Sequence, residues 1–274
     1  MLTASVVAYN TQKTYLQKVI ACLENSLVDK IFVVDNASNT DLKAFVQGLS
    51  EKITYIQGQG NVGYGAANNI AIREAMKLGA KYHLVLNPDV EFAEGTLEML
   101  TTFMDEHPDV GVVQPKALYP NGNTQYLCKL LPTPTDLIFR RFLSRTQTNN
   151  KRTKQYELHS KDRSLTHFDI PFLSGCFLFL RIDTLQQIGL FDERFFLYLE
   201  DVDLSRRIQH FARTAFYPST TITHTYGKGS YKKTYLLLQH ITSAVKYFNK
   251  WGWFSDKSRD EINQRMLKNI KNHG

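Results

Sequence analysis

The stretch Leu84-Val85-Leu86-Asn87-Pro88-Asp89-Val90 contains the pattern that decides the fold. Three apolar residues, led in by Tyr82-His83, predict a buried strand. Pro88 ends this strand, because a proline cannot donate to a sheet ladder and keeps the preceding residue out of helical geometry. Asp89 then lies at the carboxyl end of the strand, where open α/β sheets bind their ligands. An aspartate there either caps a turn or binds a ligand, and the stretch alone leaves both roles open.

Strands and helices alternate through the first part of the chain. The predicted elements are a strand at 3–10, a helix with Leu16, Val19, Ile20 and Leu23 on one side, a strand at 31–34, a helix over 42–49, a strand at 53–56 and a helix over 70–78. Strands joined by helices run parallel, so this part is predicted to be a Rossmann-like sheet. Residues 58–69 are rich in Gly and Asn and are predicted to be a loop before a helix, where backbone N–H groups can cradle phosphate.

The second part of the chain continues the same α/β pattern. The predicted elements are a helix over 94–105, strands at 110–115 and 177–180, a short helix ending at Gly189, a helix that begins at Glu200, strands at 215–217 and 220–223, and an amphipathic tail helix over 235–254. We therefore predict a single α/β domain with a mostly parallel central sheet flanked by helices.

Composition narrows the possible partners. Hydrophobic residues make up 43% and charged residues 22% of 274 residues, which is typical of a folded globular chain. The net charge of +7 favours a phosphate-bearing partner or an anionic membrane surface. The polar, basic segment 146–161 is predicted to be a mobile loop; it lacks interleaved aromatic residues, so no nucleic-acid partner is expected.

Cysteines and hydropathy bear on where the protein works. Cys22, Cys128 and Cys176 are far apart and form no paired motif, which predicts neither a disulfide nor a zinc site. No signal peptide precedes the first strand, and no apolar run approaches the roughly 20 residues of a membrane span. We expect a cytoplasmic protein. The sequence leaves open whether it also contacts the inner face of the cell membrane.

Six short motifs follow one another along the chain. They are VVDNAS at 33–38, GNVGYGAANN at 60–69, LNPD at 86–89, SG at 174–175, FDERFFLYLEDVDLSRR at 191–207 and HTYGKGS at 224–230. In this order they resemble the inverting glycosyltransferases of family 2, and among these the bacterial rhamnosyltransferases. The resemblance covers roughly Ser5 to Phe248 and implies the GT-A fold. It divides the chain into a nucleotide-sugar-binding half (1–115), an acceptor and catalytic half (116–230) and a helical tail (231–274).

The resemblance also implies roles for individual residues. Asp35 would hold the nucleobase or ribose, and Asp89 with His224 would hold Mg²⁺ or Mn²⁺. Asp201 would be the catalytic base that takes the proton of the acceptor hydroxyl. The remaining donor contacts would come from Asn10, Asn36, Asn61, Gly63, Gly65, Asn69, Asn87 and Lys228, and the acceptor contacts from Ser174, Gly175 and Glu200.

One residue departs from the family pattern, and two assignments have rivals. Asn87 stands where many relatives have a second acid, so the metal would be shared between Asp89, His224 and the donor diphosphate. His224 taken alone would be an ordinary histidine at a strand end. Asp203 is the rival base, although its spacing from Arg207 is that of an ion pair on a helix surface.

The reaction implied is transfer of a sugar from a nucleoside diphosphate to a glycan or lipid-linked glycan in cell-surface polysaccharide assembly. The preferred donor is dTDP-L-rhamnose, and UDP-linked galactofuranose or glucose fits the same motifs. A non-catalytic nucleotide-sugar-binding protein is the alternative of another class. A nucleotidyltransferase ranks low, because the first strand is followed by Tyr9-Asn10-Thr11-Gln12 and not by a Gly-rich basic signature. The basic, aromatic tail helix either lies against the domain or contacts a membrane.

Overall fold

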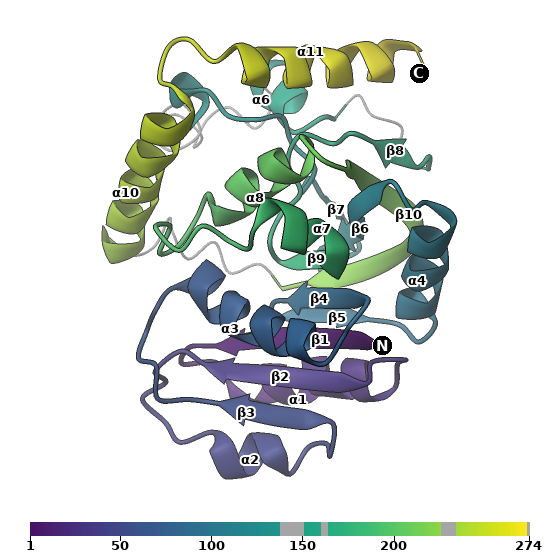
Figure 1. The fold of residues 1–274 in the computed structure, drawn as a ribbon, viewed down its shortest axis with the longest axis vertical. Helices are drawn as coiled ribbons and strands as arrows, with labels where there is room; N and C mark the ends of the chain where they lie inside the picture. The colour runs from purple at the N-terminus through teal and green to yellow at the C-terminus, as the bar shows by residue number, and fades with distance from the viewer. Residues whose placement is uncertain (138–150, 160–163, 226–233, 273–274) are drawn as a thin grey trace.

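The computed structural model describes residues 1–137, 151–159, 164–225 and 234–272. Its centre is one sheet with the strand order β3-β2-β1-β4-β9-β6-β10-β5, with β7 beside β6 and β8 beside β10 (Figure 1). The strands are β1 Leu2–Ala8, β2 Lys30–Asp35, β3 Ile53–Ile56, β4 Tyr82–Leu86, β5 Val90–Phe92, β6 Val110–Leu118, β7 Thr124–Gln125, β8 His167–Phe168, β9 Phe177–Arg181 and β10 Arg213–His224. The helices are α1 Lys13–Glu24, α2 Lys43–Gln47, α3 Tyr64–Lys77, α4 Thr96–Glu106, α6 Lys151–Tyr156, α7 Ile182–Ile188, α8 Glu200–Ile208, α10 Thr234–Trp251 and α11 Lys257–Asn272.

The first half of the sheet confirms the predicted parallel arrangement. β1 pairs in parallel with β2 on one side and with β4 on the other, and β2 pairs in parallel with β3. The four apolar residues predicted on one side of the first helix are all buried in α1: Leu16, Val19, Ile20 and Leu23. Parallel strands that are covered on both faces form nearly continuous apolar runs, which explains why β1, β2 and β4 could be found from sequence.

The second half of the sheet is mixed. β9 lies antiparallel between β4 and β6, and β6 pairs in parallel with β10. Two late strands were predicted where the structure has the single strand β10, whose register shifts between Tyr217 and Thr221. Pro218 lies inside that shift, and a residue without an N–H is accommodated where the ladder is interrupted. β6 crosses the boundary predicted at residue 115, so the two predicted halves share one sheet.

Three further expectations need correction. α3 begins at Tyr64, so the predicted loop 58–69 is helical over its second part. Lys151–Tyr156 forms α6 inside the segment that was predicted to be a loop, and residues 146–150 and 160–161 of that segment lie outside the described ranges. The tail forms two helices rather than one.

The break in the tail has a local cause. α10 ends at Trp251, and Gly252 follows with φ of 108°. A side chain is strained at this φ, and an added Cβ would lie 2.6 Å from the carbonyl oxygen of Ser255. α11 was missed, although its buried residues Ile262, Met266 and Ile270 recur every four positions.

A buried ion pair fastens the tail to the domain. Arg206 of α8 donates two hydrogen bonds to Asp256, over 2.7 and 2.5 Å, and both side chains are almost completely buried. The guanidinium of Arg206 also lies 4.0 Å from the ring centre of Trp251. Asp256 accepts from the backbone N–H of Arg259 as well, so it caps α11 while it pairs with α8. The junction between α10 and α11 is therefore attached to the helix that begins with Glu200 and Asp201.

We expect Asp256→Asn to destabilise the protein by about 3–5 kcal/mol, because it leaves the Arg206 guanidinium buried without a counter-charge. Asparagine still caps a helix, so the change isolates the ion pair. The measurement is the urea unfolding midpoint. Glu74→Gln removes the exposed pair with Lys77 and is expected to cost less than about 0.5 kcal/mol. Equal effects of the two variants would contradict the role given to Asp256.

The remaining predictions on cysteines and membrane spans can be compared with the structure directly. Cys22, Cys128 and Cys176 are all free thiols, as predicted. No helix within the described ranges combines the length and the apolar character needed to cross a bilayer.

Candidate active site

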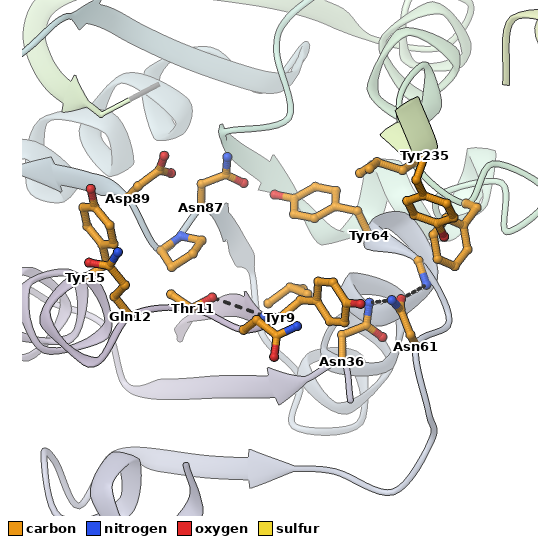
Figure 2. A pocket seen from close by; sticks show the side chains of 16 residues that line it. Tyr9, Thr11, Gln12, Tyr15, Asn36, Asn61, Tyr64, Asn87, Asp89 and Tyr235 are labelled. Atoms are coloured by element: carbon orange, nitrogen blue, oxygen red, sulfur yellow. Dashed lines mark hydrogen bonds between the residues drawn. The ribbon is translucent and has the colours of Figure 1, made fainter. Parts of the chain in front are cut away.

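A pocket of about 430 Å³ opens at the carboxyl ends of β1, β2 and β4 (Figure 2). This volume lies within the range of small-ligand sites. Asn87 and Asp89 lie at one end of the pocket in Figure 2, and Tyr235 lies at the other. The lining residues are Val7, Tyr9, Asn10, Thr11, Gln12, Tyr15, Asn36, Asn61, Gly63, Tyr64, Asn87, Pro88, Asp89, Phe196, Leu197 and Tyr235.

Two asparagines hold the loops that form one wall. Asn36 follows β2, and its side chain donates to Asn61 over 2.9 Å and accepts from the backbone N–H of Val62 over 2.9 Å. Asn10 follows β1 and accepts from the backbone N–H of Asn39. Asn10 itself has φ of 51°, a left-handed conformation that asparagine tolerates better than most residues. Short amide side chains thus fix the loops that leave neighbouring strands.

Gly63 allows the start of α3 to approach the opposite wall. Its φ is 90°, and an added Cβ would lie 2.3 Å from the carbonyl oxygen of Phe196. The next residue, Tyr64, donates its backbone N–H to that same oxygen over 2.9 Å. The N-terminal end of α3 therefore lies at the pocket, where the helix dipole favours negative charge.

Asp89 and His224 meet through the pairing of β5 with β10. These strands are antiparallel, with His224 opposite Val90, and the backbone N–H of Thr225 donates to the carbonyl of Asp89. The His224 Nε2 lies 3.5 Å from Asp89 Oδ1. Asp89 lines the pocket, and His224 lies behind it with only 4% of its surface exposed.

Gln125 orients the imidazole of His224. Its Nε2 donates to the carbonyl of His224, so its Oε1 is the atom that faces His224 Nδ1 at 3.0 Å. An amide oxygen only accepts, so Nδ1 carries a proton and Nε2 is the nitrogen directed at Asp89. Burial lowers the pKa of His224, but Cys176 and the Asp89 carboxylate outweigh it and raise the pKa to about 10. A metal ion at Nε2 would therefore replace a proton.

The side chains that could bind a metal ion here suit a cation that also binds a substrate. Within the described residues, no group of three or more His, Cys, Asp or Glu side chains is arranged to hold a metal ion. One carboxylate and one oriented imidazole are available, and Mg²⁺ commonly binds through one or two carboxylates together with substrate phosphates and water. Asp89 and His224 could hold such an ion only in company with a ligand that brings its own oxygen atoms.

Asp201 is held in one orientation by two backbone groups. The N–H of Gly175 donates to its Oδ2 over 2.8 Å, and the N–H of Val202 donates to its Oδ1 over 2.9 Å. Gly175 in turn accepts from the Tyr64 hydroxyl, which connects Asp201 to a residue that lines the pocket. Two consecutive left-handed residues, Tyr198 and Leu199, turn the chain so that α8 begins immediately before Asp201.

Glu200 and Asp201 are neighbouring carboxyl groups in the first turn of α8. Burial raises the pKa of Asp201, and the two N–H donors offset part of that effect. Burial and the charge of Asp201 raise the pKa of Glu200 well above its usual range. Glu200 is 5% exposed, and its Oε2 has no hydrogen-bond partner among the described residues. Burial thus raises the pKa of both carboxyl groups, and the two backbone N–H donors make the effect smaller for Asp201 than for Glu200.

Asp203, the rival base, points elsewhere. It is fully buried and accepts from Arg207, from the Trp251 indole and from Lys250, over 2.8, 2.8 and 2.6 Å. The predicted pair with Arg207 exists, but it is buried rather than on a helix surface. Neither Asp201 nor Asp203 lines the pocket. Asp201 is linked to it through Gly175 and Tyr64, whereas Asp203 connects α8 to α10.

The structure brings together some of the residues predicted to contact the donor and leaves others apart. Asn10, Asn36, Asn61, Gly63, Asn87 and Asp89 line the pocket. Asp35 does not, because its carboxylate accepts from the Tyr55 hydroxyl and from the backbone N–H of Ser38. Asn69 lies within α3, where its side chain bonds Phe191 and Glu193. Gly65 lies against Phe191 and Glu200, and Lys228 lies outside the described residues.

The residues predicted to contact the acceptor lie next to Asp201 rather than on the pocket wall. Gly175 donates to Asp201, and an added Cβ on Gly175 would lie 3.2 Å from the Asp201 Cβ. The carbonyl of Ser174 accepts from the Gln114 side chain over 2.6 Å. Gly175 thus contacts the carboxylate directly, whereas Ser174 and Glu200 are the chain neighbours of Gly175 and Asp201.

Sequence reasoning missed several lining residues. Tyr9, Thr11, Gln12 and Tyr15 follow β1, and the rule that ligands bind at the carboxyl ends of parallel strands could have found them. Phe196, Leu197 and Tyr235 come from segments with no such local signal. Their position depends on how α3, α8 and α10 are arranged.

The chain is similar to a known protein family and to individual proteins. Residues 3–189 match the family model described as glycosyl transferase family 2. The chain is 24% identical over 236 residues to an N-acetylglucosaminyl-diphospho-decaprenol L-rhamnosyltransferase of Mycobacterium tuberculosis, which covers 82% of this chain and 76% of that protein. It is 24% identical over 285 residues to the rhamnosyltransferase WbbL of Escherichia coli K12, which covers 94% of this chain and 96% of WbbL.

A solved structure shares the fold over the whole chain. The mannosyltransferase PcManGT of Pyrobaculum calidifontis, in complex with GDP-Man and Mn²⁺, superposes with a TM-score of 0.59 at 15% identity, covering 100% of this chain and 75% of PcManGT. The likeness confirms the predicted GT-A fold.

Proposed function

The chain belongs to glycosyltransferase family 2, and from this premise we propose that it transfers L-rhamnose from dTDP-L-rhamnose, with inversion, to a hydroxyl of a glycan or lipid-linked glycan. Membership of the family makes it a nucleotide-sugar-dependent glycosyltransferase. One observation carries the chemistry: Asp89, on the pocket wall, has the His224 Nε2 at 3.5 Å. This pair suits a divalent cation that also binds the diphosphate of a donor.

The proposed reaction needs charge stabilisation on one side of the sugar and a base on the other. A divalent cation, when bound, would neutralise the charge that develops on the departing diphosphate. Asp89 and His224 would hold that ion, and the N-terminal end of α3 favours anionic groups in the same pocket. Asp201 would accept the proton of the acceptor hydroxyl as that oxygen attacks the anomeric carbon. A single displacement inverts the configuration.

The sugar donor is the finer part of the proposal and depends on relatives. Both curated relatives named above are rhamnosyltransferases, and one of them aligns over nearly the full length of both chains. The name of the mycobacterial relative specifies a diphospho-decaprenol acceptor. A lipid-linked glycan is accordingly the preferred acceptor class for this chain.

A panel of nucleotide sugars tests the donor. Thermal unfolding is measured with dTDP-L-rhamnose, UDP-galactofuranose, UDP-glucose and GDP-mannose, each with Mn²⁺, with Mg²⁺ and with EDTA. A ligand that binds the native state raises the apparent melting temperature by mass action. We expect the largest metal-dependent rise with dTDP-L-rhamnose. A larger rise with a UDP-sugar would make that sugar the donor in place of dTDP-L-rhamnose. The absence of a metal-dependent rise with every nucleotide sugar would overturn the proposal.

The rate of transfer should fall on the acid side at a pH above the ordinary aspartate value of 3.8. Burial raises the pKa of Asp201, so Asp201 takes up its proton, and stops acting as a base, at a higher pH than a solvated aspartate. The measurement is the pH dependence of kcat with the best donor, with fluorescence to verify folding at each pH. Glu200→Gln should leave this acid-side fall in place, because burial, and not Glu200, is the main cause of the raised pKa of Asp201. A midpoint at or below 3.8 would contradict the assignment of Asp201.

A further inference from the structure

The outer face of α10 exposes an apolar stripe. Tyr235, Leu238, Ile241 and Val245 are spaced three or four residues apart and therefore lie along one side of the helix. Their exposed fractions are 54%, 56%, 45% and 41%. The side that faces the domain buries Ser243, Tyr247 and Phe248 instead. An apolar stripe on the outside of a helix is typical of a contact surface.

The stripe continues past the end of the helix. Asn249 is exposed one turn beyond Val245, and the Trp253 indole donates to its side chain over 2.8 Å. Trp253 is 37% exposed, and the neighbouring Phe254 is 94% exposed. We call the set Tyr235, Leu238, Ile241, Val245, Trp253 and Phe254 the α10 face. Aromatic residues at the end of such a face suit the boundary between water and lipid.

The α10 face begins at the candidate active site. Tyr235 lines the pocket at the end opposite Asn87 and Asp89 (Figure 2). Figure 1 shows α10 along one edge of the molecule, extending away from the sheet toward α11. A surface that touches the α10 face would therefore lie next to the mouth of the pocket.

Acidic residues are absent from the part of the sequence that contains the α10 face. No Asp or Glu occurs in the sequence from Leu204 to Ser255, whereas Arg and Lys recur through it. The acids that face α10 from its neighbours are neutralised: Asp192 pairs with Arg194 and Lys250, and Asp203 pairs with Arg207 and Lys250. An apolar face without acidic residues complements a surface that is apolar inside and anionic outside.

We propose that the α10 face rests on an anionic lipid bilayer and holds the mouth of the pocket at the membrane surface. This rests on the proposed function, because a lipid-linked acceptor presents its glycan at that surface. The contact is interfacial: the apolar side chains enter the boundary between head groups and acyl chains, and the net charge of +7 attracts the chain to anionic head groups. The face delivers the acceptor hydroxyl to the pocket and takes no part in the chemical step.

Vesicle flotation with the full chain tests the proposal. The vesicles are phosphatidylcholine alone or phosphatidylcholine mixed with phosphatidylglycerol. The test variant combines Leu238→Ser, Ile241→Ser and Val245→Ser. The matched control combines Leu78→Ser, Met99→Ser and Phe211→Ser, whose side chains are exposed to a similar degree on other elements. Tyr235 is left unchanged because it lines the pocket.

We expect the wild type and the control to bind the mixed vesicles and to bind phosphatidylcholine weakly. The test variant should bind at least about tenfold more weakly, because each serine removes buried apolar area. Added salt should weaken wild-type binding. Equal binding of test variant and control, or no binding by the wild type, would overturn the proposal. A wild-type dimer that the test variant converts to a monomer would assign the face to a second copy instead.

The two proposals fail separately. Flotation needs no nucleotide sugar, and the donor panel needs no vesicle. The test variant should give the same thermal shifts with donor and metal as the wild type, so a loss of vesicle binding with those shifts intact assigns the α10 face to the membrane and not to the donor site.

Discussion

Asp201→Asn should slow sugar transfer by about 10²- to 10⁴-fold, the contribution of a positioned general base. Both carboxylate oxygens of Asp201 accept from backbone N–H groups. The asparagine oxygen can keep one of these hydrogen bonds, but the NH₂ group cannot accept the other and takes up no proton from the acceptor hydroxyl. Binding of the donor should be retained, because Asp201 lies behind Tyr64 and not on the pocket wall. The measurements are initial rates of nucleoside diphosphate release with acceptor, and thermal shift with donor.

The control for this variant is Asp183→Asn. Asp183 is an exposed acid in the first turn of α7, so it undergoes the same chemical change at the start of a neighbouring helix. We expect its rate to stay within about twofold of wild type, since surface substitutions usually have small effects. If Asp201→Asn transferred sugar at the wild-type rate, the base would have to be sought elsewhere, and Asp203 is committed to Arg207, Lys250 and Trp251.

Asp89→Asn should lower kcat/KM by at least about 100-fold and abolish the metal dependence of donor binding. Groups that only orient a metal ligand contribute about 10- to 100-fold to metal affinity, and a ligand itself contributes more. Asn87 carries no charge, so Asp89 is the carboxylate after β4 that can hold a cation. Without the Asp89 carboxylate, His224 is the one proposed metal ligand that remains. The thermal shift with donor should therefore become the same in Mn²⁺ and in EDTA.

Glu91→Gln is the matched control for Asp89→Asn. Glu91 lies on β5, two residues further along, in an exposed ion pair with Lys18. That pair is worth little, and its loss should change neither kcat/KM nor metal dependence. An Asp89→Asn protein that still responds to Mn²⁺ as the wild type does would show that the ion, if required, is held by other groups.

The first half of the fold was predictable because its signals are local. Val33 and Val34 in β2, and the apolar residues of β4, are continuous because both faces of the strand are covered. The spacing of Leu16, Val19 and Leu23 is that of one helix face. Apart from α11, the missed elements are short or depend on distant partners: β5 has three residues and exists through its pairing with β10.

The candidate site also contains residues that could be predicted from the sequence and residues that could not. Asn10, Asn36, Asn61, Asn87 and Asp89 could be placed near one another, because the carboxyl ends of parallel strands meet at one edge of a sheet. Asp35, for which the resemblance implied a nucleobase or ribose contact, is not among the lining residues and accepts from Tyr55 and Ser38. The loop was predicted to extend to Asn69, because its Gly-Asn composition hides the start of α3 at Tyr64.

The sequence by itself determined the family, the parallel half of the sheet and the strand end that carries Asp89, because motif order and hydrophobic periodicity are properties of neighbouring residues. Only the tertiary structure decided what Asp89 faces. The antiparallel pairing of β5 with β10 brings His224 to it, and Gln125 turns the imidazole so that Nε2 is directed at the carboxylate. Burial likewise decided that the pKa of Glu200 lies well above its usual range, and a long-range contact decided that Asp203 accepts from Trp251 of α10. Burial and long-range pairing are set by segments far apart in the chain, and no local pattern reports them.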